Sequence, residues 1–181
     1  QMQNQNPLNP MDSADFAVQL ATFSGVEQQV RTNTLLASLA GRFDLMGMAQ
    51  MSGLVGQEAL STAPVHFDGT PVTILPAPKS GADAAVLAVR DTAGNLVARE
   101  TLPLDGAPYL WLGGGVTGSP LPAGRYTLSV ESQSGGRVIE TAPVPAYARI
   151  TEARRDGDGV MLVLQGGVQV AAEQVTGFRR P

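Results

Sequence analysis

The hydrophobic pattern begins with a region of helical period. From Asp12 onward, large apolar residues recur three or four positions apart, a spacing that places them on one face of an α-helix. These residues are Phe16, Leu20, Phe23, Val26 and Val30. The pattern resumes in Leu35, Leu36, Leu39 and Phe43, and again in Leu45, Met48 and Met51. Because Gly25, Gly41 and Gly47 weaken its continuity, we expect two or three helical pieces, the first capped by Asp12 or Ser13.

After Gly53 the period changes to that of β-strands. Short apolar runs alternate with turn residues, as in Asp91-Thr92-Ala93-Gly94 and Pro122-Ala123-Gly124. The expected strands include residues 63–67, 84–90, 95–101, 125–132, 136–142, 147–155, 159–164 and 167–171. About ten such strands, with no alternating helices, predict a mainly β fold, either a sandwich or a small barrel.

The apolar helical face has to be buried against something. Residues 12–52 are too few to bury it among themselves, so its partner is either the β region or another molecule. An amphipathic segment beside a complete β unit favours association with another molecule.

Composition removes several classes of function. The 181-residue chain is 43% hydrophobic and 15% charged, with a net charge of −4 and a pI near 4.9. This balance gives no general attraction to nucleic acid or to anionic membranes. The absence of cysteine excludes disulfides and thiol chemistry. Since Gln1 is not an initiator Met, we expect the native start, with any export signal, to lie before it.

Two short motifs imitate ligand-binding loops. Gly113, Gly115 and Gly118 satisfy GxGxxG, but Ser119-Pro120-Leu121-Pro122 follows and cannot open the helix that a dinucleotide site requires. The stretch 156–159 (DGDG) begins like a calcium loop and lacks the later ligands, which favours a hairpin turn.

The remaining candidates have simple structural interpretations. His66, the only histidine, fits an exposed or half-buried strand position, and Trp111 in an apolar run fits the core. Carboxylates are scattered singly, so no general acid and base pair can be assigned. We therefore expect no catalytic residue, metal or cofactor.

Several segments resemble the bacterial flagellar hook-capping, or hook-assembly scaffolding, proteins. The most specific are residues 3–12 (QNQNPLNPMD), which lead into the helix, and residues 19–28 (QLATFSGVEQ) within it. Residues 52–59 (SGLVGQEA), 91–97 (DTAGNLV) and 121–126 (LPAGRY) are also similar. Where the family usually has Trp-Asp-Gly, this chain has Trp111-Leu112-Gly113.

The resemblance implies an architecture that periodicity could not supply. Residues 1–52 would form an extended lead-in and amphipathic helices, and residues 53–70 and 144–181 a tudor-like or SH3-like β-barrel. A fibronectin-III-like or Ig-like sandwich, residues 71–143, would be inserted into that barrel. A tudor-like barrel suggests methyl-lysine binding, but Phe67, Tyr147 and Phe178 are too dispersed to form an aromatic cage.

The resemblance also implies a function. Such a protein is exported by the flagellar secretion apparatus and forms an oligomeric cap at the tip of the growing hook, where it promotes polymerisation of hook protein. The helix would contact the hook or distal rod, with Phe16, Leu20, Phe23, Val26 and Val30 as candidate contact residues. Two alternatives remain: a secreted β-sandwich module that binds carbohydrate or a surface receptor, and an enzyme.

Overall fold

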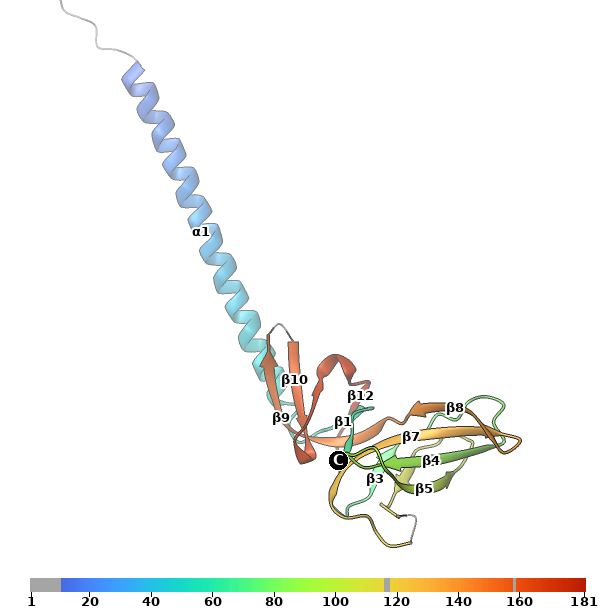
Figure 1. The fold of residues 1–181 in the computed structure, drawn as a ribbon. Helices are drawn as coiled ribbons and strands as arrows, with labels where there is room; N and C mark the ends of the chain where they lie inside the picture. The colour runs from blue at the N-terminus through green and yellow to red at the C-terminus, as the bar shows by residue number, and fades with distance from the viewer. Residues whose placement is uncertain (1–10, 116–117, 158) are drawn as a thin grey trace, which may run out of the picture. The chain divides into compact units, whose positions relative to one another are not determined.

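The structure is a computed structural model that describes residues 11–115, 118–157 and 159–181 (Figure 1). The chain divides into two compact units, residues 1–49 and 50–181, which are described separately. The extended lead-in expected at residues 1–10 lies outside the described residues, as do the side chains of Asp12 and Ser13. Among the described residues, no helix combines the length and hydropathy needed to span a bilayer.

A single helix, α1 (Met11–Ser52), replaces the two or three helical pieces expected from the sequence. Its three glycines each cost about 1 kcal/mol relative to alanine, a penalty that good helix formers on either side can offset. No proline interrupts the segment. The hydroxyls of Thr22, Thr32 and Thr34 each donate to the carbonyl four residues earlier, at 2.8 to 2.9 Å, so these polar residues are accommodated without a break.

The rest of the described chain is built from antiparallel strands and two 3₁₀ turns, η1 (Gln165–Gly167) and η2 (Ala172–Gln174). The strands are β1 (Glu58–Ser61), β2 (Val65–Phe67), β3 (Val72–Ile74), β4 (Ala84–Arg90), β5 (Leu96–Leu102), β6 (Tyr109–Trp111), β7 (Gly124–Ser134), β8 (Arg137–Pro143), β9 (Ala146–Asp156), β10 (Gly159–Leu164), β11 (Val168–Ala171) and β12 (Gly177–Arg179).

One sheet has the order β11-β10-β9-β1-β12. The strand β1, which comes first along the chain, lies between β9 and β12 in this sheet. The chain leaves β1 at Ser61 and enters β9 at Ala146, with 84 residues between them. Numbered along the chain within this sheet, the order is 4-3-2-1-5, with η2 before the last strand, which is the order of SH3-like small barrels. The segment between β1 and β9 is thus an insertion into this sheet.

The inserted segment forms a second sheet with the order β2-β7-β4-β5, and β8 also pairs with β7. Figure 1 shows β4, β5, β7 and β8 side by side. The pair β3 and β6 joins the other sheet through one residue pair, Ile74 with Ala146. Side chains from β3 and β6 pack with those of β4, β5 and β7 in a shared core, as in a sandwich.

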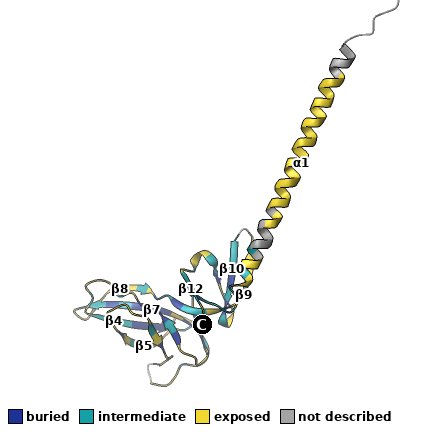
Figure 2. Ribbon diagram, turned by 180° about the vertical axis from the view of Figure 1, so that it is seen from behind, coloured by how far each residue is buried: buried dark blue, intermediate teal, exposed yellow. Residues whose placement is uncertain are grey.

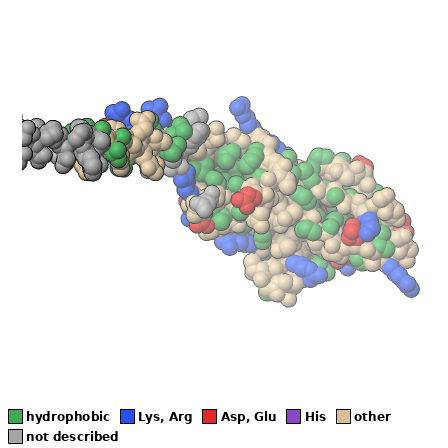
Figure 3. Space-filling model, turned by 90° about the horizontal axis from the view of Figure 1, so that it is seen from above, with side chains coloured by type: hydrophobic (Ala, Val, Ile, Leu, Met, Phe, Trp, Pro, Cys, Tyr) green, Lys and Arg blue, Asp and Glu red, His purple; other side chains and the backbone are tan. Residues whose placement is uncertain are grey.

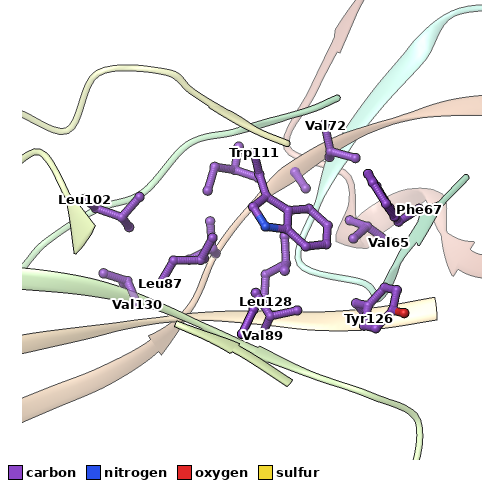
Figure 4. Close-up of a cluster of buried hydrophobic side chains, with 14 of the residues drawn as sticks. Val65, Phe67, Val72, Leu87, Val89, Leu102, Trp111, Tyr126, Leu128 and Val130 are labelled. Atoms are coloured by element: carbon purple, nitrogen blue, oxygen red, sulfur yellow. The ribbon is translucent and has the colours of Figure 1, made fainter. Parts of the chain in front are cut away.

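The β unit contains two hydrophobic cores. Trp111 is fully buried in the larger one, with its ring centroid 5.2 Å from that of Phe67 and 6.1 Å from that of Tyr126 (Figure 4). Its indole Nε1 has no acceptor among the described residues. The smaller core lies in the barrel-like sheet and contains Ala59, Ile150, Leu162, Leu164, Val168 and Val170.

The strand β2 was expected in the barrel, which was predicted to include residues 53–70, but it lies in the sandwich. It pairs with β7 and buries Val65 and Phe67 in the larger core, so it is part of the sandwich. Only β1 of the range 53–70 pairs within the barrel-like sheet. The sequence pattern could not separate two short strands with only three residues between them.

Candidate functional site

The five candidate contact residues lie on one face of α1. At 3.6 residues per turn, Phe16, Leu20, Phe23, Val26 and Val30 fall within an arc of about 120°. All five side chains are exposed, by 52 to 72%. Figure 2 shows the described part of α1 almost entirely in the colour of exposed residues, and Figure 3 shows hydrophobic side chains at its surface. Their contact role stays a prediction, but the geometry is that of an unpartnered apolar surface.

The second apolar group of the helix is exposed as well. Leu35, Leu36 and Leu39 are 65%, 58% and 50% exposed. Among the described residues of α1, no three His, Asp or Glu side chains are grouped to hold a metal ion. The helix can therefore offer contact area and little chemistry.

The β unit contains a small cavity beside a partly buried arginine network. The cavity has a volume of about 90 Å³, and its lining includes Glu58, His66, Tyr147 and Arg179. Arg179 Nε donates to Glu58 Oε2 at 2.6 Å, and Arg179 Nη2 donates to Thr73 Oγ1 at 3.0 Å. The guanidinium carbon lies 3.9 Å from the centre of the Tyr147 ring.

This network joins strands of the β unit. Its members come from β1, β3, β9 and β12, so one arginine ties four strands together. The positive charge of Arg179 is already paired with a carboxylate and an aromatic face. Local sequence patterns could not predict this cluster, because its members are up to 121 residues apart.

Two carboxylates have a lowered pKa for local reasons. The pKa of Asp91 is lowered mainly by a hydrogen bond from the Asn95 side chain, at 3.0 Å. The pKa of Asp68 is lowered mainly by the Thr70 hydroxyl. A lowered pKa keeps both groups ionised at neutral pH, which is unsuited to a general acid. Both belong to turns and follow the ordinary pattern by which Asp stabilises a turn.

The two motifs that resemble ligand-binding loops lie in connections between strands. After Gly113, Gly115 and Gly118 the next element is β7, so no helix follows them. Residues 156–159 join β9 to β10 as a hairpin, with Asp156 opposite Gly159, although residue 158 itself is outside the described chain. Within the described ranges, no three His, Asp or Glu side chains are grouped to hold a metal ion.

His66 and the aromatic residues also have structural places. His66 is half-buried in β2, as predicted, and Trp111 is in the core, as predicted. Phe67 packs on Trp111 in the larger core. Tyr147 and Phe178 face opposite sides of their sheet, because they pair with the consecutive residues Leu60 and Ala59. The aromatic cage is therefore not assembled.

The sequence pattern did not indicate that two leucines of an apolar run are exposed. Leu110 and Leu112 are 52% and 63% exposed on either side of the buried Trp111. The run Tyr109-Leu110-Trp111-Leu112 is apolar throughout, so periodicity could not indicate which residues face solvent.

Comparison with known proteins identifies the family. The family model of the N-terminal region of flagellar hook capping proteins matches residues 1–38. The family model of the FlgD Ig-like domain matches residues 61–136, which include β2. The chain belongs to the flagellar hook capping family. Both models match this one chain, which confirms the resemblance noted in the sequence.

Two similar proteins cover most of the chain, and a third covers a shorter stretch. The basal-body rod modification protein FlgD of Escherichia coli K12 is 27% identical over 176 residues, covering 91% of this chain and 76% of its own length. Its counterpart in Salmonella typhimurium LT2 is 24% identical over 181 residues, covering 91% and 75%. A protein of the FlaA locus of Bacillus subtilis, YlxG, is 46% identical over 44 residues, covering 24% of this chain and 31% of its own length.

Solved structures of hook capping proteins support the fold. FlgD of Xanthomonas campestris has a TM-score of 0.56 at 22% identity, covering 70% of this chain and 95% of its own. FlgD of Pseudomonas aeruginosa has a TM-score of 0.50 at 23% identity, covering 68% and 96%. A mainly β fold with an N-terminal helix and an Ig-like domain is thus confirmed.

Proposed function

We propose that the protein is a non-enzymatic scaffold that caps the growing flagellar hook and promotes polymerisation of hook protein. The proposal rests on one observation: two family models of hook capping proteins match this chain, at residues 1–38 and at residues 61–136. The similar proteins of E. coli and Salmonella are named basal-body rod modification proteins, and FlgD of X. campestris is described by its role in hook capping.

The geometry supports binding as the work of this protein. The described part of α1 offers large exposed apolar side chains, and the β unit has two packed cores of its own. The partners in the proposal are hook protein, the distal rod and further copies of the chain in an oligomeric cap. The site of action is the hook tip, reached by export through the flagellar secretion apparatus.

A deletion tests the proposal. A flagellated bacterium that lacks its own hook capping protein receives either the full chain or residues 50–181, which form a separate compact unit with both cores. The full chain should restore hooks seen by electron microscopy, and the deletion should not. Because loss of export would give the same failure, the amount of each protein outside the cell is measured as well.

A second variant separates export from assembly. Phe23→Glu places a charge in the exposed face of α1 without removing any segment. We expect this variant to be exported in normal amount but to form few hooks. Normal hooks from the chain without residues 1–49, or failure of the full chain despite export, would contradict the proposal.

A further inference from the structure

A groove lies on the outer surface of the sandwich, where β4 ends and β7 begins. Its volume is about 420 Å³, within the roughly 300 to 1,000 Å³ that is typical of ligand sites. Arg90, the last residue of β4, and Arg125, the second residue of β7, both line it. The exposed threonines Thr92 and Thr127 also belong to the lining. The groove therefore brings cationic and hydroxyl groups together on an open surface.

The register of the two strands places both arginines on one face of the sheet. Arg90 is opposite Thr127, and Arg125 is two positions before Thr127 on the same strand. Side chains two positions apart on a strand share a face, and the alternate residues of β7, Tyr126 and Leu128, are buried in the larger core. Arg90 and Arg125 are thus diagonal neighbours on the outer face, a relation in which residues lie about 7 to 8 Å apart.

Each arginine is held in place by a backbone carbonyl. Arg90 Nη1 donates to the Gly94 carbonyl at 3.1 Å, within its own hairpin. Arg125 Nε donates to the Gly166 carbonyl, also at 3.1 Å. A carbonyl orients a guanidinium without neutralising its charge, and a guanidinium has five N–H donors. Both arginines are therefore positioned to donate further hydrogen bonds to an anion.

The charges of the two arginines are not neutralised within the described part of the chain. Among the described residues, neither Arg90 nor Arg125 forms an ion pair with a carboxylate. On the same strand as Arg125, Glu131 is already paired with Arg99. The groove thus has two cationic side chains that can each take a carboxylate, the anion that a guanidinium binds with two parallel hydrogen bonds.

The one carboxylate in the lining of the groove is committed to a turn. Asp91 Oδ1 accepts hydrogen bonds from the backbone N–H groups of Ala93 and Asn95, each at 2.9 Å, and Oδ2 accepts one from Asn95 Nδ2 at 3.0 Å. These bonds keep the carboxylate turned to its own loop, in the usual manner of Asp in a turn. Asp91 therefore stabilises the loop at the edge of the groove and does not pair with the arginines.

The size and openness of the groove indicate the kind of anion. Apart from the half-buried Asp91, all its lining residues are exposed, so a ligand would lie on the surface and not in an enclosed cavity. A single small anion would fill little of this space, whereas a peptide segment makes contacts along its length. The net charge of −4 opposes the approach of nucleic acid and anionic membranes, which carry many negative charges. A short acidic segment of a protein fits both the size and the charge.

We propose that this groove binds an acidic segment of a protein partner, with one carboxylate of the segment on Arg90 and another on Arg125. In an extended segment, side chains two positions apart share a face and are separated by about 7 Å. This spacing matches that of the two arginines, so an acidic residue at every second position would reach both. The site lies on the sandwich and is independent of the contacts proposed for α1.

The test is a titration of the full, ¹⁵N-labelled chain followed by nuclear magnetic resonance. The probe is a peptide blocked at both ends, Gly-Ser-Glu-Ser-Glu-Ser-Gly, and its matched control has glutamine in place of both glutamates. Inorganic phosphate is titrated separately, to distinguish a free anion from a peptide segment. The amide signals of residues 91–94 and 125–127 report on the groove.

Three single variants show whether the arginines are responsible. Arg90→Gln and Arg125→Gln each remove one charge from the groove. Arg137→Gln is the control, because Arg137 is exposed and forms no ion pair among the described residues. It pairs with Ser134, nine positions beyond Arg125 on β7. At about 3.3 Å per residue this is roughly 30 Å away, well beyond the screening length of about 8 Å.

The acidic peptide should shift the signals of the groove in a saturable way, and the glutamine peptide should not. Arg90→Gln and Arg125→Gln should each weaken binding about threefold or more, while Arg137→Gln should bind as the wild type does. Because Arg125→Gln also changes the bond to Gly166, Thr127→Glu provides a test that keeps both arginines. It places a carboxylate of the chain itself between them and should abolish binding, whereas Thr127→Gln should not.

Other results would overturn the proposal. Absence of any shift with the acidic peptide, or equal shifts with the glutamine peptide, would show that the groove does not select carboxylates. Equal binding by the wild type, both arginine variants and Thr127→Glu would place the peptide elsewhere. If phosphate shifts the same signals with an affinity equal to that of the acidic peptide, the groove is a site for free anions and not for a protein segment.

Discussion

The imidazole of His66 occupies the space into which a side chain at Gly166 would project. A Cβ atom on Gly166 would lie 2.3 Å from Cγ of His66, too close for any real contact. His66 belongs to β2 of the sandwich, and Gly166 belongs to η1, between two strands of the barrel-like sheet. Nearby, Gln165 Nε2 donates to Asp68 Oδ2 at 2.7 Å and Arg125 Nε donates to the Gly166 carbonyl at 3.1 Å. The contact is thus part of the junction between the two β parts.

Gly166→Ala should lower the free energy of unfolding by about 3 kcal/mol. About 1 kcal/mol comes from placing a side chain at φ +79°, and the rest from overpacking against His66. The matched control is Gly136→Ala, which has nearly the same φ, +76°, but open space around the new Cβ. The control should lose only about 1 kcal/mol in urea denaturation.

A double variant tests whether the junction causes the difference. Adding His66→Gly to Gly166→Ala removes both the ring and the Cβ of His66, which the new methyl group would meet at 2.3 and 2.4 Å, so part of the loss should be recovered. Equal losses for Gly166→Ala and Gly136→Ala, with no coupling to His66, would show that the contact does not matter.

Arg179→Ala should destabilise the barrel-like sheet by about 1 to 2 kcal/mol. The side chain is 39% exposed, so its ion pair with Glu58 is partly screened by solvent, while its contacts with Thr73 and the Tyr147 ring add to the loss. Arg180→Ala removes an exposed arginine from the next position and should change stability by less than about 0.5 kcal/mol. Thermal unfolding measures both. Similar effects of the two variants would argue against a structural role for the Arg179 network.

The sequence predicted the helix and strand segments that are determined by neighbouring residues. The strands at residues 84–90 and 159–164 were predicted with the bounds that the structure shows, because each is a clear apolar run between turn residues. The apolar face of α1 formed by Phe16, Leu20, Phe23, Val26 and Val30 was also predicted, since helical period depends only on neighbouring residues.

Elements that depend on distant partners were harder to predict. The three-residue strands β3 and β12 were not identified, because so short a segment becomes a strand only through its pairing across the fold. The continuity of α1 was missed because its glycines weaken a helix without ending it. Gly113 was weighed as part of a nucleotide motif, whereas its importance comes from Phe67, 46 residues earlier.

Gly113→Ala should therefore be strongly destabilising. The new Cβ would lie 2.1 Å from Cζ of Phe67, and the residue has φ +73°. Phe67 is buried and cannot move without disturbing Trp111, so we expect a loss of about 3 kcal/mol or more and a change in tryptophan fluorescence. Gly81→Ala, at φ +85° in open space, should lose about 1 kcal/mol with unchanged fluorescence. A Gly113 variant as stable as the Gly81 variant would contradict the packing described.

The hydroxyl of Tyr109 should titrate at unusually high pH. It donates a hydrogen bond to Glu100 across β6 and β5, which raises its pKa to about 12, with burial and the glutamate charge adding to the effect. The folded pKa exceeds the unfolded value of about 10, so folding is favoured by the neutral phenol below pH 10. That contribution should be lost as the pH rises from about 10 to about 12.

Ultraviolet absorbance of tyrosinate, compared between the wild type and Tyr109→Phe, measures this titration. The variant should lack the component with a midpoint near pH 12 and should lose less stability over that interval. Glu100→Gln keeps an acceptor but removes the charge, so it should move the Tyr109 midpoint toward lower pH. If Tyr109→Phe instead removes a component with a midpoint near pH 10, the hydrogen bond to Glu100 does not control the ionisation of Tyr109.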